Sequence, residues 1–447
     1  MLRSQGGAIM SAEAQASAAE SPAPTLLPVS VRVRILLYLA VLIFLLNFGA
    51  PFLGLIDVPI SFFLKNKLHL SAHEVAIFRL VASIPLYVSF LFGFARDVFN
   101  PFRSRDRGYM MLFGAVTAAV YVYFAFADVS YTMLLFAVAL STVAFLFVNA
   151  AQAGLTSALG QRNVMSGQVA TVWNIVSSLP VLGSYWLGGV FSDMLEGKNA
   201  GDAARLLFLT GAAIMLAIAV YGVWSPRVVF DHVHDAAQEK AHPFANMQRL
   251  LSHWPVYPAL AIWFMWSFAP GSVTPLQYYL QNTLHSNDAQ WGEWNAIFAA
   301  AFIPTYLLFG YLCTRYPLRT LLIWGTAVGV PQFVPLLFVH STTAALVAAA
   351  PIGLMGGVAT AAYYDLMIRS CPRGLEGTVL MMAVGLYYIA GRFGDLLGTS
   401  LYDRFGGFGI CVAAITITYA LILPTILLVP KGLIATADGE VPKPEVG

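Results

Sequence analysis

The sequence has 447 residues, of which 59% are hydrophobic and 10% are charged, with a net charge of +2 and a mean hydropathy of +0.73. Soluble globular chains carry roughly 25% charged residues, so this composition excludes a soluble domain, and the small net charge excludes a nucleic-acid partner. The three cysteines lie far apart, which excludes a disulfide framework and a zinc-finger spacing.

The chain begins with a polar, proline-containing stretch, residues 1–30, which predicts a disordered cytoplasmic tail in place of a signal peptide. Beyond it lie apolar runs of about 20 residues, the length that spans a bilayer as a helix. The sequence therefore predicts an all-α membrane protein with twelve transmembrane helices. The predicted spans are 33–55, 74–97, 108–127, 131–155, 165–191, 205–224, 256–280, 291–313, 318–339, 343–368, 375–398 and 408–430.

A polar segment, residues 226–255, separates six spans from the next six and predicts a cytoplasmic linker. The bundles on either side cover residues 31–225 and 256–430, and a second cytoplasmic tail follows at 431–447. Most of the 24 lysines and arginines fall on the side of both termini when the spans are threaded in order. Because cytoplasmic loops are enriched in these residues, we expect a multi-pass protein of the inner (plasma) membrane with both termini cytoplasmic.

The two halves resemble each other in sequence, which predicts two parallel six-helix repeats. The second span ends in Gly93-Phe94-Ala95-Arg96-Asp97, and the eighth ends in Gly310-Tyr311-Leu312-Cys313-Thr314-Arg315. Arg162 precedes Gly167 much as Arg373 precedes Gly377. Only a threonine, Thr314, stands where the first half has Asp97.

The sharpest motif is Gly93-x-x-x-Asp97, followed by Arg103, Arg105 and Arg107. A glycine there lets two helices approach closely. Asp97 lies at the C-terminus of a predicted helix, where the helix dipole disfavours an anion, so it requires a partner. The alternative is an ordinary basic cytoplasmic loop with an incidental aspartate.

This motif resembles the loop signature of the major facilitator superfamily. Three stretches, residues 62–71, 97–102 and 371–378, further resemble its folate–biopterin transporter branch. The resemblance implies a proton-coupled carrier of a pterin or folate. It also implies that Asp97 meets the start of the eleventh helix, after Pro372 and near Glu376, as a gate that closes the cytoplasmic side. The stretch Ile84-Pro85-Leu86-Tyr87 departs from that branch, which leaves the solute open.

Five further charged residues fall within predicted spans, where an unpaired charge at mid-bilayer costs about 2.5–3.5 kcal/mol. They are Arg79, Glu293, Asp365, Arg392 and Asp395. Pairing or a water-filled cavity is therefore expected, and each is a candidate for binding solute or coupling ion.

The spacing of these charges suggests partners. Arg392 and Asp395 share a helix face and can pair, either as an interhelical brace or as a coupling site. Asp365 has Arg369 four residues later, which favours a structural or gating pair. Glu293 is the first candidate for a proton-titrating carboxylate, with a position at the outer membrane interface as the alternative.

The seventh and tenth spans supply candidates for the solute cavity, since the resemblance implies that helices one, four, seven and ten line it. Trp263 and Trp266 could offer ring faces to a planar solute. Gln277 and Tyr363 could add hydrogen bonds. The alternative is that these residues only pack or sit at membrane interfaces.

The sequence thus favours a secondary active transporter of a small organic solute that works by alternating access. Its expected partners are that solute, a proton or other coupling ion and the lipid bilayer, and the protein is expected to be monomeric. The alternatives are a carrier of another solute, such as a peptide, muropeptide or sugar, and a non-transporting homologue that assists membrane assembly. The histidines are scattered and no nucleotide-binding loop is visible, so we expect no enzyme, metal site or cofactor.

Overall fold

The structure, a computed structural model, describes residues 27–52, 55–57, 60, 63–64, 68–70, 72–99, 104, 106–127, 130–196, 200–230, 243–405 and 407–440. Within these ranges the side chains of residues 72, 73, 76, 184–196, 200, 243, 288 and 289 are not described. The expected disordered tail therefore lies mostly outside the described residues, and α2 begins at Val29.

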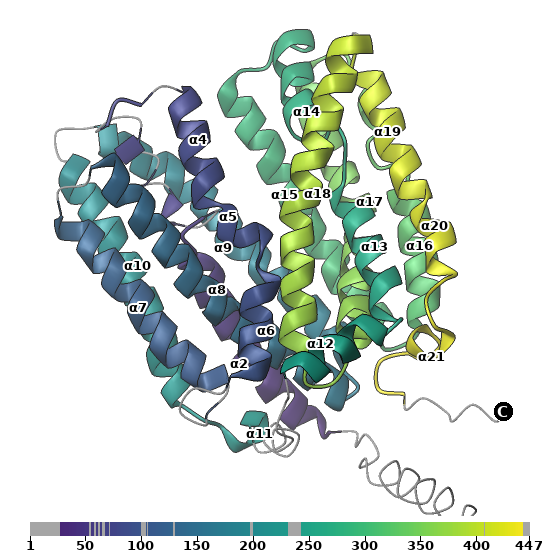
Figure 1. The fold of residues 1–447 in the computed structure, drawn as a ribbon. Helices are drawn as coiled ribbons and strands as arrows, with labels where there is room; N and C mark the ends of the chain where they lie inside the picture. Colours follow the sequence, from purple (N-terminus) through teal and green to yellow (C-terminus); the bar gives the residue numbers. More distant parts are fainter. Residues whose placement is uncertain are drawn as a thin grey trace, which may run out of the picture.

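The described residues form two groups of helices that lie side by side (Figure 1). The first group contains α2 (Val29–Phe48), α4 (Ala72–Ala82), α5 (Ile84–Tyr87), α6 (Phe90–Val98), α7 (Asp106–Phe126), α8 (Tyr131–Arg162), α9 (Ser166–Glu196) and α10 (Ala200–Val223). The second contains α13 (Val256–Ser267), α14 (Thr274–Tyr278), α15 (Asp288–Leu312), α16 (Leu318–Gly329), α17 (Thr342–Ser370), α18 (Glu376–Phe405), α19 (Phe408–Ala420) and α20 (Ile422–Ile426). Along the chain, α11 (Arg227–Phe230) and α12 (Pro243–Ser252) come after the first group and before the second, and α21 (Lys431–Ile434) follows α20.

Nine helical segments of the described chain are long and apolar enough to cross a membrane. The expected fifth span is also one long helix, α9 of 31 residues, whose side chains are described only as far as residue 183. Two other expected spans are broken into shorter helices. The second becomes α4, α5 and α6, with Pro85 at the first break, and the seventh is interrupted between α13 and α14 at Pro270-Gly271. Proline removes a backbone donor, and Gly271 adopts φ +110°, a conformation that favours glycine, so the helix cannot continue there.

The groups meet through two pairs of contacts. Helix α18 of the second group packs against α6 and α8 of the first, and α9 of the first packs against α15 and α17 of the second. We call the end where α2 begins and α21 lies the tail end, at the bottom of Figure 1, and the opposite end the open end. The groups diverge toward the open end in this view.

The expected C-terminal tail differs from the structure. Residues 431–440 fold back against the helix bundle, and the side chain of Asp438 is buried. We call residues 431–440 the returning segment. The polar composition of this segment predicts a solvated tail. The segment is instead buried in part, because the Asp438 carboxylate has hydrogen-bond donors inside the protein.

Candidate functional site

A buried ion cluster joins α6 to α18 at the tail end. Asp97 Oδ2 accepts hydrogen bonds from the backbone N–H of Thr378, at 2.7 Å, and from its hydroxyl, at 2.6 Å. Thr378 is the third residue of α18, where backbone N–H groups have no partner inside the helix. The carboxylate therefore sits at the positive end of the dipole of α18, away from the unfavourable end of its own helix.

Arg96 lies at the centre of this cluster. Its guanidinium is 2.6 Å from Asp97 Oδ1 and 2.5 Å from Asp106 Oδ1, and all three residues are buried. The guanidinium rests on Gly154 of α8, where a Cβ would overlap it. One arginine thus binds two carboxylates from neighbouring helices inside the protein.

Close helix packing brings these groups together. A Cβ on Gly93 would overlap the backbone carbonyl of Gly377, and a Cβ on Gly377 would meet Asp97 and Arg96. Two glycines therefore allow α6 and α18 to touch through their backbones. Ser89 strengthens the crossing by donating to the carbonyl of Met381 at 2.6 Å.

The remaining gate candidates take different places. Glu376, the first residue of α18, is buried and interacts electrostatically with Arg96. Arg107 instead donates to the carbonyls of Gly222 and Val223 at the C-terminus of α10, at 2.9 and 2.8 Å. Arg103 and Arg105 lie outside the described residues.

Sequence reasoning missed the roles of Arg96 and Asp106. Arg96 reads as one more basic residue of a cytoplasmic loop, yet it is 5% exposed. The available signal was its position inside the apolar span, next to Asp97, where a charge needs compensation. Asp106 reads as part of an arginine-rich loop, but it starts α7.

A second buried ion cluster lies at the tail end of α17. Arg369 binds Asp365 through two hydrogen bonds, at 2.9 and 3.2 Å, and also contacts Asp438 of the returning segment at 3.1 Å. Its Nε also donates to the hydroxyl of Ser166 on α9, at 3.0 Å. Burial and the neighbouring Asp365 raise the pKa of Asp438 to about 7, against the opposing effect of Arg369.

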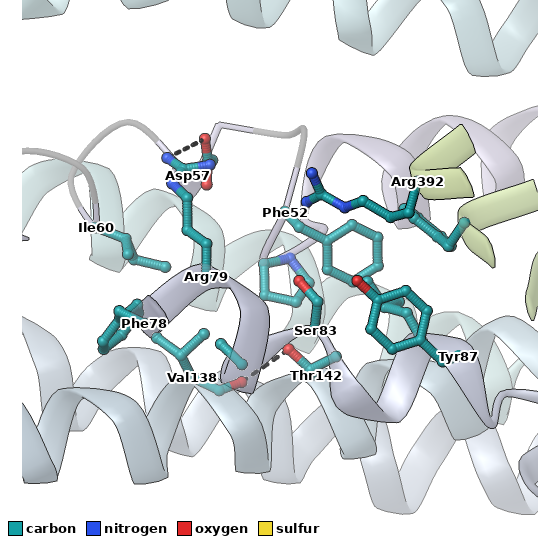
Figure 2. Close-up of a pocket in the computed structure, with 14 residues that line it drawn as sticks. Phe52, Asp57, Ile60, Phe78, Arg79, Ser83, Tyr87, Val138, Thr142 and Arg392 are labelled. Carbon is teal, nitrogen blue, oxygen red and sulfur yellow. Dashed lines mark hydrogen bonds and ion pairs between the residues drawn. The ribbon is translucent and has the colours of Figure 1, made fainter. Parts of the chain in front are cut away.

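A cavity of about 150 Å³ lies between the groups, on the open-end side of these clusters (Figure 2). Side chains from both groups line it, chiefly Phe52, Asp57, Arg79, Tyr87, Tyr388 and Arg392. Figure 2 shows the side chain of Arg392 reaching from α18 toward Phe52, while Arg79 is paired with Asp57 at 3.3 Å. The cavity therefore combines aromatic rings with two guanidinium groups.

The expected pair of Arg392 and Asp395 is not present. Asp395 accepts hydrogen bonds from the backbone N–H and the hydroxyl of Thr274, at 2.9 and 2.8 Å. The break before α14 leaves free N–H groups that attract the carboxylate away from its helix neighbour. Arg392 is exposed toward the cavity, and no ion pair to it is found within the described part of the chain.

The aromatic candidates pack between helices and do not line this cavity. Trp263 donates to the carbonyl of Ala383 at 3.0 Å, and Trp266 donates to Thr360 at 3.1 Å while stacking on Tyr419. Tyr363 is buried and bonds to Thr326 at 2.6 Å. Their polar atoms are already satisfied inside the second group.

Two further candidates lie nearer the open end. Gln277 is half-buried on α14. Glu293 is exposed in the second turn of α15. Among the described residues, no cluster of histidine, cysteine or carboxylate side chains suited to a metal ion is found.

Comparison with known proteins resolves the family. The sequence profile of the Major Facilitator Superfamily matches residues 180–399. Solved structures from that superfamily share the fold over most of the chain. A proton:xylose symporter bound to 6-bromo-6-deoxy-D-glucose has a TM-score of 0.66 and 11% identity, covering 90% of this chain and 96% of that one. The transporter FucP in its outward conformation has a TM-score of 0.68 and 13% identity, covering 88% and 98%.

This profile match identifies the chain as a major facilitator transporter. The protein is therefore a multi-pass membrane protein and a secondary transporter, because this superfamily consists of transporters and not of enzymes. Major facilitator transporters bind small solutes, often with proton coupling. Among curated proteins, the folate–biopterin transporter of Synechocystis sp. is 22% identical over 411 residues, covering 85% of this chain and 79% of the relative.

Proposed function

We propose that this protein is a secondary active transporter of a folate- or pterin-like organic solute, which it moves by alternating access with proton coupling. The observation that supports this most is the cavity between the two helix groups, which Arg79 and Arg392 line together with the rings of Phe52, Tyr87 and Tyr388. Aromatic faces suit a flat conjugated ring, and guanidinium groups suit an anion. The named relative supports the same class of solute.

The proposed architecture has twelve spans in two parallel six-helix repeats, in an inner membrane with both termini cytoplasmic. The broken segments α4–α6 and α13–α14 supply the spans that no single long helix provides. The contacts of α6 with α18 and of α9 with α15 support the repeat, because α6 and α15 occupy equivalent positions in the two halves, and so do α18 and α9. In this arrangement the tail end is cytoplasmic and closed, and the cavity faces the other side.

The size of the cavity bears on the solute. At about 150 Å³ it is smaller than the roughly 300–1,000 Å³ of most pockets for drug-sized ligands. It accommodates a ring system, and a whole folate requires further separation of α4 and α5 from α18. Such separation is the motion that alternating access supplies.

Uptake into proteoliposomes under an imposed pH gradient tests the proposal. We expect accumulation of labelled folate or pterin, and Arg392→Gln is expected to lower uptake about tenfold or more, because the solute loses a charged partner. Arg404→Gln is the matched control, since Arg404 is an exposed arginine in the last turn of the same helix. Accumulation of only a peptide or sugar would reject the solute class. No accumulation of any solute would favour a role in membrane assembly.

For coupling, Glu293 remains the proposed proton carrier. It is exposed near the open end of α15, where it can exchange protons with that side. In the same vesicles Glu293→Gln should abolish the pH dependence of uptake while sparing solute exchange. Retained pH dependence would move the coupling role to another carboxylate.

Asp97 is the proposed gate at the tail end, together with Gly93 and Glu376. Asp97→Asn keeps an acceptor for the N–H of Thr378 but loses the charge that faces Arg96. We expect the tail end to open more often and transport to fall several-fold, because a charge-assisted bond is worth about twice a neutral one. Accessibility of the tail end to a water-soluble thiol reagent measures this, and unchanged accessibility together with unchanged transport would rule the gate out.

A further inference from the structure

Two helices begin in the same way at the tail end, one in each group. Helix α18 starts Glu376-Gly377-Thr378 and α9 starts Ser166-Gly167-Gln168. In both, backbone N–H groups of the first turn point to a carboxylate that comes from another part of the chain. A helix start binds a carboxylate because its N–H groups have no partners within the helix.

The source of the carboxylate differs between the halves. On α18 it is Asp97, from the end of α6. The corresponding position at the end of α15 is Thr314, which has no carboxylate and is exposed. On α9 the carboxylate is Asp438, which accepts from the N–H groups of Gly167 at 3.1 Å and Gln168 at 2.9 Å.

The arginines that bind these two carboxylates, Arg96 and Arg369, also have similar surroundings. Arg96 binds Asp97 and a second carboxylate, Asp106. Arg369 binds Asp438 and a second carboxylate, Asp365. Each half therefore places one arginine between two acids, beside the start of a helix from the other half.

Backbone contacts hold the returning segment in this position. The N–H of Asp438 donates to Cys313 of the second group, and the N–H of Gly439 donates to Val164 of the first, both at 2.8 Å. Arg369 also donates to the carbonyls of Leu433 and Thr436, at 3.3 and 3.0 Å. The segment thus contacts both groups at once.

We propose that the start of α9 and Arg369 form a carboxylate-binding site, and that the returning segment is its ligand. Asp438 replaces the acid that is missing at Thr314, so the tail end is closed by two equivalent locks. One is built into the α6–α18 crossing, and the other is a detachable segment. The effect of this second lock on transport rests on the alternating access proposed above.

Cys313 offers a reporter for this contact. It is 1% exposed, and its sulfur lies 4.0 Å from Asp438 Oδ2. In a protein with Cys371→Ser and Cys411→Ser, we measure the rate of Cys313 labelling by a charged maleimide in detergent. Asp438→Ala, and separately deletion of residues 431–447, should raise the rate about tenfold or more, since each removes hydrogen bonds to a charged group.

Lys431→Ala is the matched control, because Lys431 is an exposed residue of the same segment. It should leave the labelling rate unchanged. Size-exclusion profiles and the melting temperature check that each variant is folded. A folded deletion variant that labels Cys313 at the parent rate would overturn the proposal.

The site also predicts a pH dependence. The groups facing Asp438 are Asp365 and Arg369 of α17, Cys313 of α15, and Ser166 with the N–H groups of α9. Because burial and Asp365 raise the pKa of the docked Asp438 to about 7, above the value of about 3.9 for a free aspartate, docking takes up a proton between these values. Docking is therefore strongest at low pH and weakens as the pH rises to about 7.

Labelling of Cys313 should follow this trend. The rate is divided by that of Asp438→Ala at the same pH, so that the ionisation of the undocked thiol, which is the form that reacts, cancels. This ratio should rise about tenfold or more between about pH 5.5 and 7.5. Asp438→Asn cannot ionise and should show a flat relative rate. A flat rate in the parent protein would remove the pH dependence from the proposal.

These measurements use no solute, so they test the contact independently of transport. Failure of every solute to accumulate would count against the proposed function and leave the labelling result standing. Unchanged labelling alongside normal uptake would instead remove the second lock and keep the transporter.

Discussion

Replacing Gly93 by alanine is expected to shift the protein away from the conformation in which the tail end is closed. The added methyl group would overlap the backbone carbonyl of Gly377, and a backbone carbonyl cannot rotate aside as a side chain can. Overpacking of this kind costs about 1–3 kcal/mol, which changes the ratio of two conformations by about 5- to 150-fold. The cost falls on the closed state alone, provided that α6 and α18 separate when the tail end opens.

The reporter for this prediction is Cys371, which lies between α17 and α18 and is 5% exposed. With Cys313→Ser and Cys411→Ser, labelling of Cys371 should accelerate in Gly93→Ala, and net uptake should fall. Gly391→Ala is the control, because a Cβ at Gly391 of α18 would meet no atom within 4 Å. A labelling rate equal to that of the control would show that the close crossing does not govern the closed state.

Arg96→Met is expected to cause a large loss of stability at the tail end. The change leaves Asp97 and Asp106 buried together without their common cation. Removing one partner of a buried ion pair typically costs about 3–5 kcal/mol, because an uncompensated charge stays in a medium that solvates it poorly. The melting temperature, followed by intrinsic tryptophan fluorescence, should fall well below that of Arg227→Met, which changes an exposed arginine.

A variant with all three charges removed distinguishes the effect of unpaired charge from the effect of lost packing on the stability of Arg96→Met. Arg96→Met combined with Asp97→Asn and Asp106→Asn removes all three charges. If the loss comes from unpaired carboxylates, the triple variant should be more stable than the single one, so the substitutions will not be additive. A triple variant less stable than Arg96→Met would assign the loss to packing of the guanidinium against Gly154.

The contact of Asp97 with the start of α18 was implied by the family resemblance, whereas the local sequence indicated only that Asp97 needs a partner. Asp97 follows a close-packing glycine at a helix end, and the stretch after Pro372 marks a helix start. Continuous apolar runs likewise predict long helices such as α8 and α17. The positions of helices and the need of Asp97 for a partner thus follow from nearby residues, whereas the identity of that partner, 281 residues away, does not.

The partners of Asp395 and Asp438 were not accessible in this way. Helix spacing places Asp395 beside Arg392, but the free N–H of Thr274, 121 residues earlier in the chain, binds it instead. Asp438 lies in a polar segment whose composition predicts a tail, and its donors on α9 are 270 residues away. The same reason applies to Trp263 and Trp266, whose donors are used within the helix packing. Such choices depend on which helices become neighbours.

Helix α18 contacts the gate cluster, the cavity and the start of α14 along one continuous rod of 30 residues. Thr378 binds Asp97, Arg392 faces the cavity, and Asp395 binds Thr274. At 1.5 Å per residue, Thr378 and Arg392 are about 21 Å apart, so a tilt of roughly 5° about Thr378 displaces the Arg392 backbone by about 2 Å. In the proposed gate α18 would therefore act as a lever: release of Asp97 at the tail end would move Arg392 at the cavity without any change in the secondary structure of the helix.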